Sequence, residues 1–483
     1  MIEILNYIDG EFHGAAGGNR LDVHNPATGE VHARLADSGA EDVAAAVTAA
    51  EAAFPSWRGR SAEARAEVLN RIAEGIEQRL ESLALDETND NGKPLTLARA
   101  VDIPRAARNL RFFAAAGVTF SSESHASSDG INYTLRSPLG AVGCISPWNL
   151  PLYLFTWKIA PALAAGNCVV AKPSEVTPLT AMRFAEICQQ AGLPPGVLNV
   201  VHGSGVSAGQ AVVSAPQIKA ISFTGGTATG GRIAKHLAGT FKKVSLELGG
   251  KNPNIIFADC DFDKALQTSL RSSFANQGQI CLCGSRILIQ RSLYDRFREA
   301  LVRLAKAQQI GDPLEPATQV GAIVSQAHLE KIAGCVERAR DDGGVVHCGG
   351  QIVTLGGRCA GGWFYPPTVI DGLSPTCATN QEEIFGPVVT LLPFEDEAEA
   401  IALANETPYG LSATIWTRDL GKAHRVARDV ESGVIWINSW LERDLRTPFG
   451  GQKASGLGRE GGWEAMRFFT EPKNVYVSYE NSE

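Results

Sequence analysis

GAVGCISPWNLPLY (140–153) opens the part of the sequence that decides the fold. A short β-rich run, GAVGCIS (140–146), is followed by a segment of helical length. The same alternation then repeats through CVVAK (168–172), VLNVVHG (197–203) and KAISFTG (219–225). Strands separated by helical segments are typical of βαβ units, which place their strands in a mostly parallel sheet. The sequence therefore predicts an α/β fold, with ligands bound at the carboxyl ends of these strands.

The regions on either side of this stretch extend the pattern. Residues 40–115 place apolar residues at helical spacing with charges between them. The polar segment SSESHASSDGIN (121–132) interrupts the helices and predicts an exposed ribbon or a boundary. At the other end, NVYVSYE (474–480) predicts a strand that pairs with another element or subunit. Further strands are expected at 252–259, 286–290, 388–394, 412–417 and 433–438, and further helices near 178–191, 293–309 and 329–343.

Composition excludes several classes of protein. The 483 residues include 44 Lys and Arg and 52 Asp and Glu, which gives a net charge of −8 and argues against sequence-independent binding to nucleic acid. No run approaches the ~18 apolar residues of a membrane span. The first residues, MIEILNYIDGEFHG, lack the pattern of a signal peptide. Ten scattered cysteines and nine unclustered histidines predict free thiols in a reducing cytoplasm and no metal site.

Three side chains are candidates for chemistry. Cys281, in FANQGQICLCG, follows a Gly-rich polar turn, so it is either a nucleophile or a buried structural cysteine. Glu247, in LELGGKNP, is an acid within an apolar strand, which indicates either a general base or a carboxylate that caps a turn. Asn149, in SPWNLPLY, lies between two prolines and is either an oxyanion donor or a turn residue.

Two glycine-rich turns follow expected strands. SFTGGTATGGR (222–232) lacks the Lys-Ser/Thr ending of a Walker loop, which disfavours nucleoside triphosphate binding. HGSGVSAG (202–209) is a near match to the dinucleotide fingerprint, with Ala208 in the last position. Glycine-rich turns that lead from strand to helix suit a dinucleotide, because its phosphates favour helix N-termini.

Taken together, the motifs PWN, KPSE, FTGGTATG, LELGGKNP, FANQGQIC, EEIFGP and PFGGQKASGLGRE resemble the NAD(P)-dependent aldehyde dehydrogenase superfamily. They occur in the family order and span almost the whole chain, and Glu247 and Cys281 are 34 residues apart, as in the family. The resemblance implies an aldehyde dehydrogenase-like fold in three parts. These are a Rossmann-type NAD-binding domain (1–118 and 139–249), an α/β catalytic domain (250–450) and a small β oligomerisation ribbon (119–138 and 465–483).

The resemblance also implies roles for individual residues. Cys281 is the nucleophile that forms a thiohemiacetal and then a thioester, Asn149 and the Cys281 backbone N–H form the oxyanion hole, and Glu247 activates water. The Glu175 carboxylate disfavours a 2′-phosphate, so the expected cofactor is NAD rather than NADP. The residues expected to hold NAD are Pro147, Trp148, Lys172, Glu175, Gly225, Gly230, Glu383 and Phe385.

The substrate is predicted from departures from the usual family pattern. Arg99 and Arg443 stand where many relatives carry neutral residues, in segments that line the family's substrate entrance together with Trp157 and Phe449. Either arginine could instead be solvated or form an intersubunit ion pair. Two guanidinium groups at the entrance suit a bidentate grip on a carboxylate.

This combination resembles the branch of 2-aminomuconate and 2-hydroxymuconate semialdehyde dehydrogenases. The sequence therefore predicts NAD-dependent oxidation of 2-aminomuconate 6-semialdehyde, or a close carboxylated semialdehyde, to the dicarboxylic acid. The alternatives are the 2-hydroxymuconate substrate, a neutral aromatic or retinoid aldehyde, or a non-catalytic binding protein on the same fold. A cytoplasmic homodimer or homotetramer without nucleic-acid or membrane partners is expected.

Overall fold

An eight-stranded sheet is built around the strands expected from residue 140 onwards. The computed structural model describes residues 1–479. The five central strands are all parallel and lie in the order β12, β11, β8, β9, β10. Their bounds are β8 Ala141–Ile145, β9 Cys168–Lys172, β10 Leu198–Val200, β11 Ala220–Thr224 and β12 Lys243–Glu247. The predicted parallel α/β sheet is therefore confirmed.

Short antiparallel strands close both edges of this sheet. β2 (Asn6–Ile8) and β3 (Glu11–His13) lie beyond β10, and β22 (Gly456–Leu457) pairs with β12 at the opposite edge. A separate three-stranded sheet contains β1 (Ile2–Ile4), β5 (Val31–Ala36) and β4 (Arg20–His24). β9 is buried along its whole length. Its apolar run from Cys168 to Ala171 is therefore typical of a parallel strand that is covered on both faces.

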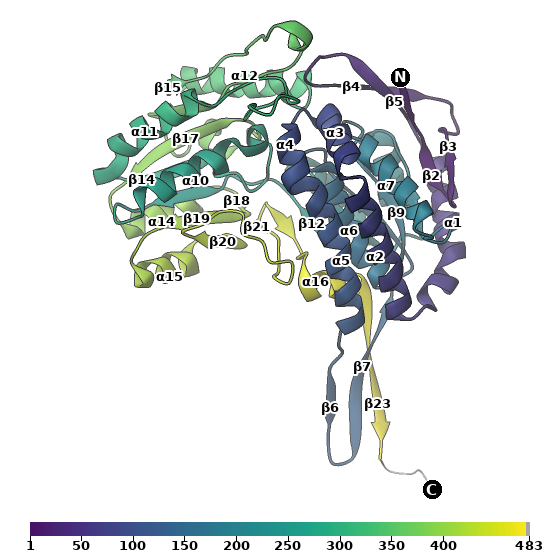
Figure 1. The fold of residues 1–483 in the computed structure, drawn as a ribbon. Helices are drawn as coiled ribbons and strands as arrows, with labels where there is room; N and C mark the ends of the chain where they lie inside the picture. Colours follow the sequence, from purple (N-terminus) through teal and green to yellow (C-terminus); the bar gives the residue numbers. More distant parts are fainter. Residues whose placement is uncertain (480–483) are drawn as a thin grey trace.

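Helices cover the first sheet, as the periodicity of residues 40–115 predicts (Figure 1). The principal ones are α1 Ala40–Arg58, α2 Ala62–Gln78, α3 Leu80–Asn91, α5 Ile103–Thr119, α6 Pro151–Ala164, α7 Leu179–Gln190 and α9 Thr227–Leu237. Between α3 and α5 the chain forms the short helix α4 (Leu95–Leu97) and a π-helical turn, η1 (Ala98–Asp102). Helix α3 ends at Gly92, whose φ of +83° is a conformation that favours glycine.

A seven-stranded sheet forms the other half of the body. Its strands run β15, β16, β17, β14, β13, β19, β20, and all neighbours are parallel except β15 and β16. The strand bounds are β13 Pro253–Ile256, β14 Arg286–Gln290, β15 Val345–Cys348, β16 Thr368–Asp371, β17 Val388–Phe394, β19 Ser412–Trp416 and β20 Val434–Ile437. Its helices include α10 Phe262–Phe274, α11 Tyr294–Lys306, α12 Gln326–Asp341, α14 Glu397–Asn405 and α15 Leu420–Asp429.

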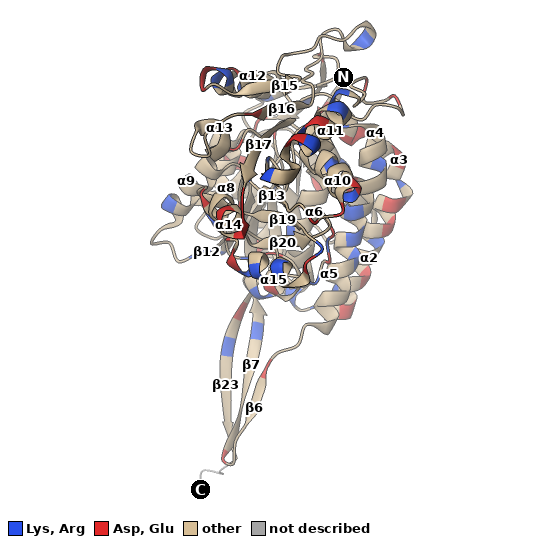
Figure 2. Cartoon of the chain, turned by 90° about the vertical axis from the view of Figure 1, so that its left-hand side faces the viewer, with Lys and Arg blue, Asp and Glu red and all other residues tan. Residues whose placement is uncertain are grey.

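A three-stranded ribbon projects from the body (Figures 1 and 2). It consists of β6 (Ser124–Ala126), β7 (Gly130–Pro138) and β23 (Thr470–Ser478), with β7 paired antiparallel to both neighbours. The expected exposed ribbon and C-terminal strand are thus confirmed, although residue 480 of the expected strand lies outside the described residues. The ribbon carries few charges (Figure 2), and within residues 1–479 no helix is long and apolar enough to cross a membrane.

Candidate active site

The loop before Cys281 has an unusual backbone. After α10, Asn276 and Gln277 adopt φ values of 51° and 55°, and Gly278 follows with φ +70°. A Cβ added at Gly278 would lie 2.1 Å from the carbonyl oxygen of Gly386. Such left-handed residues cost free energy and persist only where the surroundings hold them. Here Gln277 Nε2 donates to the Ala322 carbonyl oxygen at 3.0 Å, which fixes the loop that ends at Cys281.

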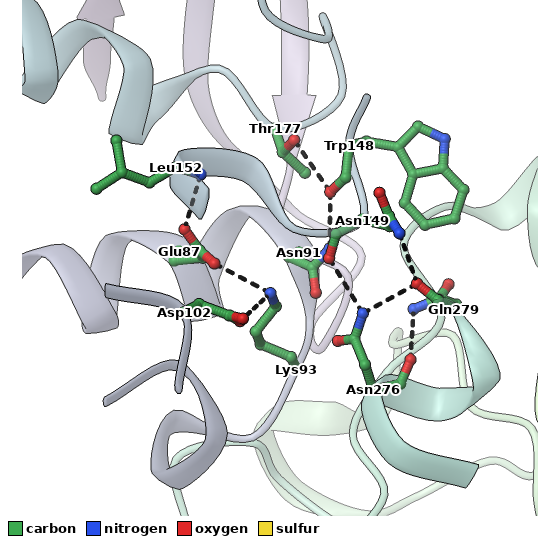
Figure 3. Close-up of polar contacts among 10 residues, drawn as sticks. All are labelled: Glu87, Asn91, Lys93, Asp102, Trp148, Asn149, Leu152, Thr177, Asn276 and Gln279. Carbon is green, nitrogen blue, oxygen red and sulfur yellow. Dashed lines mark hydrogen bonds and ion pairs between the residues drawn. The ribbon is translucent and has the colours of Figure 1, made fainter. Parts of the chain in front are cut away.

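Asn149 contacts this loop from the turn between β8 and α6 (Figure 3). Its Nδ2 donates to the Gln279 carbonyl oxygen at 3.0 Å, and its own carbonyl oxygen accepts from Asn276 Nδ2 at 3.0 Å. An amide nitrogen carries two donor hydrogens, so one remains for an oxyanion. Asn149 and Cys281 also line the same pocket, and this supports the predicted pairing of nucleophile and oxyanion donor.

Glu247 ends β12 in a buried position. Neither of its carboxylate oxygens has a hydrogen-bond partner among the described residues. Burial, reinforced by the charge of Glu460, raises the pKa of Glu247 well above its usual value. Glu460 itself accepts from Lys158 Nζ at 2.7 Å and from Ser222 Oγ at 3.1 Å. A carboxyl group with a raised pKa suits a general base that takes a proton from water.

Cys281 lies where two cavities meet. One cavity, of about 240 Å³, is lined by Trp148 and Phe385, and the other, of about 330 Å³, is lined by Glu247. Burial raises the pKa of the Cys281 thiol, and the charges of Glu383 and Glu247 raise it further. The thiol is therefore neutral near pH 7, and it gains its nucleophilicity when a proton is removed.

A groove of about 490 Å³ runs from these cavities along the carboxyl ends of the first sheet. Its lining includes Lys172 and Glu175, whose charged groups pair at 2.6 Å. Glu175 also accepts from the Gly205 N–H at 3.3 Å, which ties the second glycine-rich turn to the groove. Seven of the eight predicted NAD residues line this groove or the adjoining pocket; they are Pro147, Trp148, Lys172, Glu175, Gly225, Glu383 and Phe385.

Two observations fit a dinucleotide here. A Cβ added at Gly226, the residue that precedes α9, would meet no atom within 4 Å, so the backbone at this helix N-terminus is open to a ligand. The buried hydroxyl of Thr224, which lines the groove, has no hydrogen-bond partner among residues 1–479. The groove thus offers the accessible N-terminus of α9 to phosphate oxygens, with the unpaired hydroxyl donor of Thr224 beside it.

Gly230 has a packing role in the structure. It is buried within α9 and does not line the groove. A Cβ at this position would approach Leu248 Cδ2 to 2.4 Å. The glycine therefore permits close packing of α9 on Leu248, and its expected contact with NAD stays a prediction.

Glu383 and Phe385 line the pocket but not the groove. Glu383 Oε1 accepts from the Gly250 N–H at 2.9 Å, and burial raises the pKa of Glu383. The rings of Phe385 and Trp148 are 5.2 Å apart and nearly perpendicular. His328 Nε2 lies 2.7 Å from the Phe385 carbonyl oxygen and completes this aromatic wall. His328 could not be predicted from the sequence, because it stands in no recognisable motif.

The cavity on the Glu247 side has mostly apolar walls. Trp157 and Phe449 line it, as predicted, and so does Arg443. The guanidinium carbon of Arg443 lies 3.9 Å from the centre of the Phe449 ring and 5.7 Å from that of Trp157. Arg443 forms no ion pair within residues 1–479, and its positive charge partly offsets the rise in the pKa of Glu247, which lines the same cavity.

Arg99 does not lie at this cavity. It belongs to η1, where its neighbours Val101 and Asp102 face the cavity and its own guanidinium points to solvent. There it pairs with Glu81 at 2.7 Å on the outer surface. The π-helical turn sets which side chains of this segment face inward, and it could not be read from the sequence. The structure therefore does not bring Arg99 together with Arg443 at the cavity, where the sequence predicts both.

Arg105, which the sequence analysis missed, lies beside the cavity instead. Its guanidinium carbon lies 4.8 Å from the Tyr153 ring centre and 5.6 Å from that of Trp157, and both rings line the cavity. Arg105 Nε donates to Asn109 Oδ1, but Nη2 is buried without a partner among the described residues. Burial, opposed by Tyr153, lowers the pKa of Arg105 to about 10, so it stays charged. Arg105 precedes Asn109 by four residues, a spacing that places both side chains on one face of a helix and could have indicated their contact.

The fold and the site define an aldehyde-oxidising dehydrogenase. The chain belongs to the aldehyde dehydrogenase family, whose model matches residues 12–475. NAD-dependent aldehyde oxidation is the reaction of this family. These findings confirm the predicted fold, enzyme class and type of cofactor.

Relatives with similar sequences cover the whole chain. The 2-aminomuconic semialdehyde dehydrogenase of Danio rerio is 50% identical, with 98% of each chain covered. The 2-hydroxymuconic semialdehyde dehydrogenase of Pseudomonas sp. (strain CF600) is 47% identical, with 99% of this chain and 100% of the relative covered. A solved NAD+ complex of aldehyde dehydrogenase from Bacillus cereus is 39% identical, with a TM-score of 0.96 and coverage of 99% and 97%. The chain is thus similar to the branch that the sequence predicts.

Proposed function

We propose that this enzyme oxidises 2-aminomuconate 6-semialdehyde, or a close semialdehyde that carries a carboxylate, to the dicarboxylic acid with NAD. One observation carries the choice of substrate. The guanidinium groups of Arg105 and Arg443 both lie close to the ring of Trp157, which forms part of the cavity wall. Neither arginine has an ion-pair partner within residues 1–479. The relatives that carry muconic semialdehyde names support the same class of substrate.

Electrostatics favours an anion between these two arginines. Their like charges disfavour each other, and this repulsion contributes to the lowered pKa of Arg105. A carboxylate that accepts hydrogen bonds from both would remove the repulsion and satisfy the buried Arg105 Nη2. A neutral aldehyde would leave both charges unpaired in a largely apolar cavity. The two arginines therefore select a substrate whose far end is a carboxylate.

Chemistry begins at Cys281. The thiol first loses its proton to solvent in the cavity. The thiolate then attacks the aldehyde carbon, and the carbonyl oxygen, now negatively charged, accepts hydrogen bonds from Asn149 Nδ2 and the Cys281 N–H. Bound NAD supplies the acceptor for the hydride that leaves the aldehyde carbon. Lys172, Glu175, Glu383 and the backbone around Gly226 would hold it. The acyl group then remains on Cys281 as a thioester.

Glu247 completes the reaction by removing a proton from water. The resulting hydroxide attacks the thioester carbon, the C–S bond breaks, and the carboxylic acid leaves while Cys281 is regenerated. Burial and the charge of Glu460 keep the pKa of Glu247 high, so that the carboxylate binds the proton firmly once it is taken. Lys158 pairs with Glu460 and prevents that second carboxylate from lying unpaired in the interior.

A substitution series tests the choice of substrate. Arg443→Ala is expected to raise KM for the carboxylated semialdehyde by about 10- to 100-fold, as for a lost hydrogen bond to a charged group. Arg105→Met is expected to act in the same direction. Arg99→Ala is the matched control and should leave KM unchanged. Steady-state kinetics with the 2-aminomuconate and 2-hydroxymuconate semialdehydes and with benzaldehyde would measure these effects.

The same series can reject the proposal. If Arg443→Ala raises KM for benzaldehyde as much as for the semialdehydes, Arg443 shapes the cavity rather than binding a carboxylate. If the wild-type enzyme prefers benzaldehyde, the alternative of a neutral aromatic substrate is correct. A thermal unfolding curve for each variant separates lost binding from lost structure.

We also propose that the enzyme is a cytoplasmic homodimer or homotetramer assembled through the ribbon. Exposed apolar side chains of β7 and β23 support a partner of the same kind; they are Tyr133, Leu135, Tyr476 and Val477. All ten cysteines are free, which supports a reducing compartment.

A further inference from the structure

Helix α3 carries a buried polar face towards the loop of Asn149. Glu87 and Asn91 are four residues apart, so they lie on one side of the helix. Asn91 Nδ2 donates to the Trp148 carbonyl oxygen at 2.9 Å. Glu87 Oε2 accepts from the Leu152 N–H at 3.2 Å, in the first turn of α6 (Figure 3). The two side chains therefore hold the loop on either side of Asn149.

The carboxylate of Glu87 is itself held by a buried lysine. Lys93 Nζ donates to Glu87 Oε1 at 3.0 Å and also to Asp102. All three side chains are almost completely buried. A lysine without carboxylate partners would be too costly to bury in this way, and so would two carboxylates without the lysine. Lys93 thus fixes which way the Glu87 carboxylate points.

This cluster joins two parts of the active site. Asp102 lines the substrate cavity from η1, whereas Glu87 reaches the N-terminus of α6 next to the oxyanion donor. A negative charge at a helix N-terminus is stabilising, which adds to the Glu87–Leu152 bond. Neither Glu87 nor Lys93 lines the cavities around Cys281. Both therefore act on the reaction only through the residues that they hold.

We propose that Glu87 is a positioning residue, which Lys93 orients and which holds Asn149 in place for the oxyanion by accepting the Leu152 N–H. Substitution of Glu87 should slow the step that Asn149 assists and spare the binding of NAD. The inference rests on the family reaction alone and is independent of the substrate proposed above.

A double-mutant cycle tests this role. Glu87→Gln keeps the side-chain volume but has a single acceptor oxygen, which cannot serve both Lys93 and the Leu152 N–H. With hexanal as the substrate, kcat for NADH production is expected to fall about tenfold, the cost of one misplaced hydrogen bond. In the Asn149→Ala background the same substitution should change kcat less than about twofold. A purely structural residue would lower kcat equally in both backgrounds.

Asp90→Asn is the matched control on the same helix. Asp90 is also buried and accepts the Leu179 N–H at 2.7 Å, but this amide begins α7 and not the oxyanion loop. Asp90→Asn should lower the thermal stability, while its kcat stays within about twofold of the wild-type value. If Glu87→Gln does not fold, Glu87→Asp replaces it in the cycle, because it keeps the charge but shortens the reach to Leu152. Equal losses of kcat in the two backgrounds, or a kcat unchanged by Glu87→Gln, would overturn the proposal.

Discussion

Glu247 shows how the surroundings of one residue set its chemistry. Its carboxylate oxygens are buried and without partners in the described chain, and Glu460 adds a second negative charge nearby. Both effects disfavour the ionised form, so the pKa of Glu247 lies well above its usual value. The group is consequently protonated in acid and becomes a base only at higher pH.

This titration predicts a pH dependence of turnover. A base works when it is deprotonated, so kcat for the complete reaction should rise with pH through the raised pKa of Glu247 instead of levelling off near pH 5. Glu460→Gln removes the neighbouring negative charge and leaves Lys158 positive, and should move the rise to lower pH. Steady-state kcat between pH 6 and 9.5 measures both profiles. Identical profiles for the two enzymes would show that Glu460 does not tune this base.

The arginines show which residues could be placed from sequence. The roles of Cys281, Glu247 and Asn149 could be predicted from the resemblance of their motifs to the family, and the structure places Cys281 in one cavity with Asn149 and in another with Glu247. Arg99 and Arg105 stand six residues apart in one helical segment, and only the backbone decides which faces the cavity. Since η1 is a π-helical turn, a spacing based on the α-helix gives the wrong face.

Among the elements, the loop before Cys281 has the most demanding conformation. Gly278 combines φ +70° with a backbone oxygen 2.1 Å from a would-be Cβ. Gly278→Ala should destabilise the protein by about 1–3 kcal/mol and should reduce kcat as well, because the displaced loop carries Cys281. Thermal unfolding and NADH production measure the two effects.

Gly14→Ala is a suitable control for this loop. A Cβ at Gly14 meets no atom within 4 Å, and its backbone is not in the left-handed region. Gly14→Ala should leave the free energy of unfolding within ~0.5 kcal/mol of the wild-type value, as surface substitutions usually do. A Gly278→Ala enzyme with wild-type stability and turnover would mean that the loop is more adaptable than its backbone indicates.

Helices and strands were the most predictable features of the chain. Buried parallel strands such as β9 leave continuous apolar runs, and helices such as α11 leave an amphipathic repeat. The interior of α3 is different, because its C-terminal half buries Glu87, Asp90 and Asn91. These polar residues bind loops from other parts of the chain, so no local pattern could indicate that they are buried.

At the scale of the whole molecule, the ribbon projects from the body and leaves apolar side chains exposed (Figure 1). The proposed assembly predicts that Leu135→Glu combined with Val477→Glu shifts the enzyme to monomers, since both side chains are apolar and exposed on the ribbon. Light scattering after size-exclusion chromatography measures the mass. Val345→Glu, at an equally exposed apolar position on β15, should leave the mass unchanged. An unchanged mass in the double variant would place the interface elsewhere.

The pairing of β7 with β23 also bears on biosynthesis. Thr470 aligns with Pro138 and Ser478 with Gly130, so the central strand of the ribbon waits for a neighbour that is made more than 300 residues later. During translation the β6–β7 hairpin leaves the ribosome with one open edge. The proposed assembly through the ribbon can therefore begin only after β23 has been synthesised. Chains that terminate before β23 would lack this strand and could not join the proposed assembly.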